Sequence, residues 1–192
     1  MRHVRYVCVK SFKMLGFLKR NCTELSLRTN LHLYLALVRP NVEYASVVWN
    51  PYQSYQVMRL ERVQQRFIKW MCFKKNIEYH RCDYELMCSH HKLLTLKHRR
   101  AVIDVTFLFK VISNDIDSSI LLSRINILVP VKATRHNTLF KTHDSRINCY
   151  KNSCINRIMT TYNSIFESTG LYFDIFSETL QKLRLFILHH HF

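Results

Sequence analysis

Residues 52–73 read YQSYQVMRLERVQQRFIKWMCF, and this stretch has the clearest helical pattern in the chain. At about 100° of rotation per residue, its apolar side chains gather on one arc about 100° wide. These side chains are Leu60, Val63, Phe67, Trp70 and Met71. Four cations share an adjacent arc of about 80°, namely Arg59, Arg62, Arg66 and Lys69. The pattern predicts a long helix with one face in a core and one cationic face.

The cationic face has two interpretations. In the first it is an ordinary solvated surface, with Glu61 as an occasional partner of the cations. In the second it contacts phosphates, because four cations on one stripe repel each other unless an anion relieves them. The neighbouring Gln64 and Gln65 either hydrogen-bond to sugars or bases, or simply fill the surface.

Composition bounds the fold class. The chain has 192 residues, of which 48% are hydrophobic, so it is long enough for a real apolar core. Its two glycines are Gly16 and Gly170, and its three prolines are Pro40, Pro51 and Pro130. Tight hairpin turns need these residues, so their scarcity predicts an all-α fold.

Other segments carry helical patterns as well. A helix is expected from Val4 to Arg20 and another after Ser26, with a kink or restart near Arg39 because Pro40 removes a backbone donor. Further helices are expected at 81–87, at 101–112, through Leu121 and Leu122, at 153–166 and at 177–188. We expect three parts: a helical region at 1–75, a second helical unit at 76–129, and a basic C-terminal segment with two helices at 130–192.

The charge balance points to polyanionic partners. Lysine and arginine number 29 against 13 acidic residues, giving a formal net charge of +16 and a pI of about 9.8. Such a protein attracts nucleic acids, although high charge also serves solubility alone. Lys10 and Lys13 interrupt the N-terminus where a signal peptide would be apolar. We therefore expect an intracellular protein, nuclear or cytoplasmic, without a membrane partner.

More basic residues extend the candidate surface. From 132 to 157, cations alternate with Phe140 and Tyr150, which suits either a single-strand surface or a loosely ordered basic loop. The cations there are Lys132, Arg135, His136, Lys141, His143, Arg146, Lys151 and Arg157. The complete set of candidate nucleic-acid-binding residues is Arg59, Arg62, Arg66, Lys69, Lys74, Lys75, Arg99, Arg100 and Arg135.

No metal or catalytic motif is evident. The seven cysteines are an odd number without a secretory signal, which predicts reduced thiols. Cys82, Cys88, His90 and His91 have zinc-ligand chemistry, but their spacing does not match a structural zinc site. Two-metal phosphoryl transfer needs several converging carboxylates, and the scattered acidic residues do not form such a set. We expect no cofactor in this chain.

Two blocks carry a family resemblance. They are LVRPNVEYASVVWNP at 37–51 and LERVQQRF at 60–67. Shorter pieces lie before and after these blocks, in the family's order: LGFLKRN at 15–21, LTLKHRR at 94–100, LSRIN at 122–126, TRH at 134–136 and INR at 155–157. Together they resemble the thumb and C-terminal region of reverse transcriptases from LINE-type, jockey-like non-LTR retrotransposons. The likeness covers roughly residues 10–165. Cys154 stands where the family often has proline, and the similarity fades after Glu167.

The resemblance implies a function. The whole polymerase in that family extends DNA on an RNA template with Mg²⁺ held by two adjacent aspartates, and no two aspartates are adjacent here. The resemblance therefore implies a truncated fragment that is inactive alone, in which a thumb-like bundle holds the template-primer through Arg59, Arg62, Arg66 and Lys69. Tyr44, Trp49 and Leu60 would hold its helices together. Two alternatives stay open: a helical protein-interaction module, and a degenerate, non-functional reading-frame product.

Overall fold

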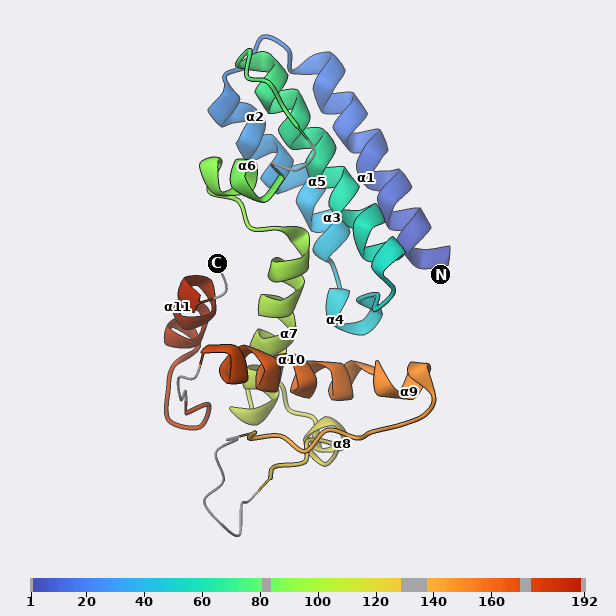
Figure 1. The fold of residues 1–192 in the computed structure, drawn as a ribbon, viewed down its shortest axis with the longest axis vertical. Coiled ribbons are helices and arrows are strands. Elements are labelled where there is room, and N and C mark those ends of the chain that lie inside the picture. The colour runs from blue at the N-terminus through green and yellow to red at the C-terminus, as the bar shows by residue number, and fades with distance from the viewer. Residues whose placement is uncertain (1, 81–83, 129–137, 170–173, 191–192) are drawn as a thin grey trace. The chain divides into compact units, whose positions relative to one another are not determined.

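The computed structural model describes residues 2–80, 84–128, 138–169 and 174–190. Helices dominate these residues (Figure 1). No strand occurs among them, and the one pairing of extended backbone is an isolated antiparallel bridge between Ile127 and Phe140. The predicted all-α fold class is confirmed. None of the described helices is long and apolar enough to cross a membrane.

The chain forms two compact units, Met1–Arg100 and Ala101–Phe192. These boundaries differ from the three parts expected from the sequence, so that three-part division stays a prediction. The first unit holds 19 of the 29 lysines and arginines but only 6 of the 13 acidic residues. The excess positive charge therefore belongs mainly to this unit.

The first unit is a helical bundle. Its helices are α1 (Arg2–Asn21), α2 (Leu27–Leu33), the π-helical turn η1 (Tyr34–Val38), α3 (Arg39–Glu43), α4 (Ser46–Trp49), α5 (Ser54–Lys74) and α6 (Tyr84–His90). Figure 1 shows α1 and α5 side by side, with the run from α2 to α3 packed against them. The core between these helices contains Leu15, Leu18, Tyr34, Val38 and Phe67. The apolar faces predicted from the sequence therefore meet one another.

Local sequence explains how the second helix begins and changes register. The Ser26 hydroxyl accepts a hydrogen bond from the backbone N–H of Thr29, as a helix cap does. The backbone then widens into η1 just before Pro40. Proline cannot donate an internal helical hydrogen bond, and α3 restarts at Arg39 with Pro40 in its first turn. The expected restart near Arg39 is confirmed.

Three helices, α5, α6 and α7, are followed by a left-handed residue that is not glycine. Asn76, Lys92 and Asn114 adopt positive φ angles of 55°, 53° and 61° immediately after helices. After α5, the N–H of Ile77 bonds to the carbonyl of Cys72, which closes the last turn around the left-handed Asn76. Ala45, between α3 and α4, also has a positive φ of 51°, a conformation that strains a residue with a Cβ.

The core of α5 follows the predicted arc, with one adjustment. Leu60, Val63, Phe67 and Met71 are buried, whereas Trp70 is only half-buried. Trp49 is also half-buried, and its indole N–H donates to the carbonyl of Tyr44 at 2.8 Å. The Tyr44 side chain is 81% exposed. The packing role expected for the Tyr44 side chain is therefore wrong, because only its backbone takes part.

The second unit is built around α7 and α10. Helix α7 (Leu96–Ile112) begins in the first unit and continues into the second, which also contains α8 (Ser119–Leu122), α9 (Asn148–Lys151), α10 (Cys154–Thr169) and α11 (Leu180–His190). Asn163 of α10 clasps the backbone of Phe140, accepting from its N–H at 3.2 Å and donating to its carbonyl at 2.7 Å. Asn156 clasps the backbone of His143 in the same way, at 2.8 and 3.1 Å. Two asparagines thus hold an extended segment against one helix.

Candidate nucleic-acid interface

The four cations predicted on α5 form one exposed row. We call Arg59, Arg62, Arg66 and Lys69 the cationic row; each of these residues is exposed. Their spacing of three, four and three residues keeps them on one helix face, and at about 1.5 Å per residue they cover about 15 Å. No ion pair joins any of the four to a carboxylate in the part of the chain that the structure describes.

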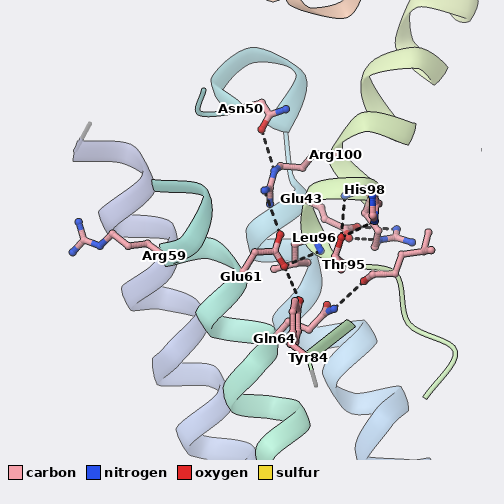
Figure 2. A network of polar contacts seen from close by, with 12 residues as sticks. Glu43, Asn50, Arg59, Glu61, Gln64, Tyr84, Thr95, Leu96, His98 and Arg100 are labelled. Carbon is pink, nitrogen blue, oxygen red and sulfur yellow. Dashed lines mark hydrogen bonds and ion pairs between the residues drawn. The ribbon is translucent and has the colours of Figure 1, made fainter. Parts of the chain in front are cut away.

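The single acidic residue of α5 lies on a different face. Glu61 Oε2 accepts a 2.6 Å hydrogen bond from the Tyr84 hydroxyl and a 3.1 Å bond from the backbone N–H of Leu96. Its Oε1 lies 3.6 Å from the Arg100 guanidinium. Figure 2 shows Glu61 among these partners and Arg59 pointing away from them. Glu61 is therefore committed to the interior instead of being an occasional partner of the cationic row.

Further buried polar contacts lie beside Glu61 on this side of α5 (Figure 2). Gln64 is fully buried; its Oε1 accepts from the Tyr34 hydroxyl at 2.9 Å and its Nε2 donates to the carbonyl of Leu94 at 2.8 Å. Arg100 donates to the side-chain oxygen of Asn50 at 3.0 Å. The network ties the start of α7 to the bundle, which explains why the first unit extends to Arg100.

Three sequence predictions change as a result. Arg100 is 1% exposed and engaged with Glu61 and Asn50, so we remove it from the candidate interface. Arg99 forms a two-pronged ion pair with Glu43, with one contact of 3.0 Å from Nη2 to Oε2, and leaves the set as well. Gln64 cannot reach a sugar or base, because its amide is buried.

Lys74 and Lys75 do not extend the cationic row. The Lys74 ammonium donates to the carbonyls of Thr23 and Leu25 at 2.7 and 2.8 Å, so it fastens the α1–α2 connection. Lys75 is exposed at the end of α5, but at about 100° per residue it falls on the side opposite to the row. Arg135 lies outside the described residues. The interface therefore contracts to the four cations of the row.

Neighbouring groups on α1 support the row. The Arg66 guanidinium carbon lies 4.6 Å from the centroid of the Phe12 ring, a cation–π contact. The Lys19 ammonium donates to the carbonyl of Arg66 at 3.2 Å. The pKa of Lys19 is lowered, chiefly because burial disfavours its charge and further because Arg66 and Lys69 are both positive. Positive charge is therefore concentrated where α1 and α5 meet.

Within the described residues, two members of the basic segment of the second unit are committed to packing, and Lys132, Arg135 and His136 lie outside those residues. Phe140 is 1% exposed, and its ring packs edge-on against Tyr162, so it cannot stack on a base. The Arg157 guanidinium pairs with the buried Asp104 at 3.2 Å. Lys141, Arg146 and Tyr150 remain exposed. The alternation of cations and aromatic residues there reflects packing as much as solvent contact.

One feature of α5 was missed in the sequence. Tyr55 and Phe73 continue the spacing of the cationic row at both ends, four residues before Arg59 and four after Lys69. Their side chains are 47% and 77% exposed. The signal is present in the sequence as a repeat of four, three, four, three and four residues.

The described residues contain no group of three or more histidine, cysteine or acidic side chains able to hold a metal ion. Cys82, part of the cluster considered for zinc, lies outside them. No protein-family model, curated protein or solved structure matches this chain.

Proposed function

We propose that the first unit binds nucleic acid through the outer face of α5, as a thumb-like part of a LINE-type RNA-directed DNA polymerase. In this role the cationic row contacts the phosphate backbone of a template-primer. The chain itself contributes binding and not catalysis, since its sequence has no adjacent aspartates to hold two Mg²⁺ ions. The polymerase assignment rests on the sequence resemblance, and the binding assignment rests on the row.

The observation that carries the binding proposal is the lack of internal neutralisation along α5. Elsewhere in the same unit, Arg99 and Arg100 are paired with Glu43 and Glu61. The four cations of the row are exposed, and none of them has such a carboxylate partner among the described residues. Clustered like charges raise the free energy of the folded protein, and a bound polyanion relieves this repulsion while releasing its own counterions.

A protein-interaction module is the second candidate. Tyr44 and Val48 are 81% and 75% exposed, and Tyr52 beyond them is 50% exposed, so three large apolar side chains lie near the start of α5. Exposed apolar groups of this kind are often used for protein contacts. This candidate predicts that binding depends on these side chains and not on the cationic row.

The test compares two sets of charge removals in the full chain. Replacing all four cations of the row by glutamine should weaken binding to an RNA–DNA hybrid by about tenfold or more at low salt, because four phosphate contacts are lost. Fluorescence anisotropy with a labelled hybrid measures the affinity. Circular dichroism checks that helicity is retained, which we expect because the substituted side chains are exposed.

The matched control removes four exposed cations from the second unit: Arg124, Lys141, Arg146 and Lys151. It changes the net charge by the same amount. Equal loss of affinity in both sets would reduce the binding to nonspecific attraction by a protein of charge +16. Unchanged affinity after removal of the row would favour the protein-interaction module.

A further inference from the structure

The outward face of α5 carries a longer pattern than the cationic row alone. Its exposed members run Tyr55, then the four cations, then Phe73, at intervals of four, three, four, three and four residues. This spacing keeps all six on one stripe, with the two aromatic residues at its ends. At about 1.5 Å per residue, the stripe is about 27 Å long.

We propose that this stripe binds single-stranded nucleic acid, with the cationic row on successive phosphates and the rings of Tyr55 and Phe73 stacked on unpaired bases. The inference rests on the proposed function and specifies its ligand. Aromatic faces beside a track of cations are the usual means of holding a single strand without reading its sequence.

The straightness of the stripe argues against a duplex as its preferred ligand. A strand of B-form DNA makes one turn in about 34–36 Å. Over the roughly 15 Å of the cationic row a duplex strand makes less than half a turn, so it can still meet the row. Over the roughly 27 Å of the whole stripe it rotates through about three-quarters of a turn and leaves the two end rings. A flexible single strand can follow the whole stripe.

The accessibility of the bases also favours a single strand over a duplex. In a duplex each base face is covered by its stacked neighbours, so rings at both ends of a side-on contact find no base to stack on. In a single strand the base faces are available. Phe73 is 77% exposed and Tyr55 is 47% exposed, with the Tyr55 hydroxyl accepting a hydrogen bond from Gln56 at 2.9 Å. Both residues therefore have solvent-accessible surface in the protein without a ligand.

The surroundings of the row favour a fixed surface over a set of freely rotating side chains. The Phe12 ring lies under the Arg66 guanidinium, and Lys19 is bonded to the Arg66 carbonyl. Both contacts come from α1, which packs along α5. Prior ordering of Arg66 lowers the entropy lost when it meets a phosphate.

The test uses the full chain and two probes: a labelled oligodeoxythymidine of about eight nucleotides and a blunt-ended duplex of similar length. In the double variant Tyr55→Leu/Phe73→Leu, affinity for the single strand should fall by about tenfold or more, while affinity for the duplex should change by less than about twofold. Phe73→Trp keeps an aromatic face and should retain single-strand binding. Because the substituted rings are exposed, circular dichroism should show an unchanged helical signal.

A matched aromatic pair on α1 provides the control. Tyr6 and Phe17 are 64% and 51% exposed, and Tyr6→Leu/Phe17→Leu should leave both affinities unchanged. The inference is overturned if the α5 double variant keeps its single-strand affinity, or if the α1 pair loses as much. If the wild-type protein binds both probes but the α5 ring substitutions do not change its affinity for the single strand, the inference fails and the proposed function survives. If it binds neither probe, the proposed function fails as well.

Discussion

The Tyr84 hydroxyl lies 2.6 Å from Glu61 Oε2, and Glu61 is the only carboxylate in α5. This contact holds the acidic residue among the buried ends of α6 and α7 (Figure 2). The neighbouring outer face of the same helix carries four cations and no acid. The interior network and the exposed row are thus two consequences of one helix orientation.

The first prediction concerns the Glu61–Arg100 pair. Glu61→Gln should destabilise the first unit by about 3–5 kcal/mol, because the Arg100 guanidinium is 1% exposed and would lose its buried counter-charge. Urea unfolding followed by circular dichroism measures this loss. Glu78→Gln is the control, since Glu78 pairs with His80 at an exposed position and should cost less than about 1 kcal/mol. Similar losses in the two variants would contradict the network's role.

The second prediction concerns alkaline pH. Burial raises the pKa of both Tyr34 and Tyr84, and nearby Glu61 raises each further. The folded state therefore keeps two phenolic protons that the unfolded chain releases above its own pKa of about 10. Stability should be unaffected below that pH and should fall as the pH rises through it, by about 1.4 kcal/mol per pH unit for each tyrosine.

Urea unfolding at several pH values between about 9 and 11 tests this linkage. Tyr34→Phe removes one of the two groups and should make the decline shallower, although it also lowers stability at neutral pH by leaving Gln64 Oε1 without its donor. A decline equally steep in wild type and Tyr34→Phe would show that other groups cause it.

The third prediction concerns backbone strain at Ala45. Its φ of 51° disfavours a side chain with a Cβ, so Ala45→Gly should raise stability by up to about 1 kcal/mol. The comparison is Ala36→Gly within η1, where glycine has no conformational advantage and should cost about 0.5–1 kcal/mol. Thermal unfolding of both variants measures the difference. Destabilisation of the same size at both sites would argue that Ala45 is not strained.

The fourth prediction concerns the Asn163 clasp in the second unit. Asn163→Ala leaves the N–H and carbonyl of the buried Phe140 without partners, and should destabilise this unit by about 2–4 kcal/mol. Hydrogen exchange at the Phe140 amide should become faster as the stability of this unit falls. Asn152→Ala is the control, because the Asn152 side chain donates to the Asn148 carbonyl one turn earlier in the chain and does not hold the Phe140 backbone. Unchanged exchange at Phe140 in Asn163→Ala would rule out the clasp.

Helical periodicity predicted much of this fold. The arcs of α5 placed Leu60, Phe67 and the cationic row correctly, because burial on a long helix repeats with the helical period. The partners of Glu61 were not predictable in the same way. Tyr84 and Arg100 are 23 and 39 residues away, and only the three-dimensional path of the chain brings them together.

Basic residues show the same limit of sequence patterns. Arg66 and Arg100 are both cations in helices, yet one is exposed and the other is among the most buried side chains of the protein. Composition cannot separate them, since the difference depends on whether a carboxylate and an amide lie within reach. The exposed rings at Tyr55 and Phe73 could have been found from their spacing relative to the row.

The salt dependence of binding distinguishes phosphate contacts at the cationic row from general attraction to a basic protein. If the cationic row contacts four phosphates, replacing all four cations by glutamine should flatten the salt dependence of binding to the RNA–DNA hybrid. The slope of log affinity against log salt concentration should become shallower by about three to four units. The control set of Arg124, Lys141, Arg146 and Lys151 should leave the slope close to that of the wild type. A slope unchanged by loss of the row, or reduced equally by the control set, would contradict the claim that the outer face of α5 is the nucleic-acid interface.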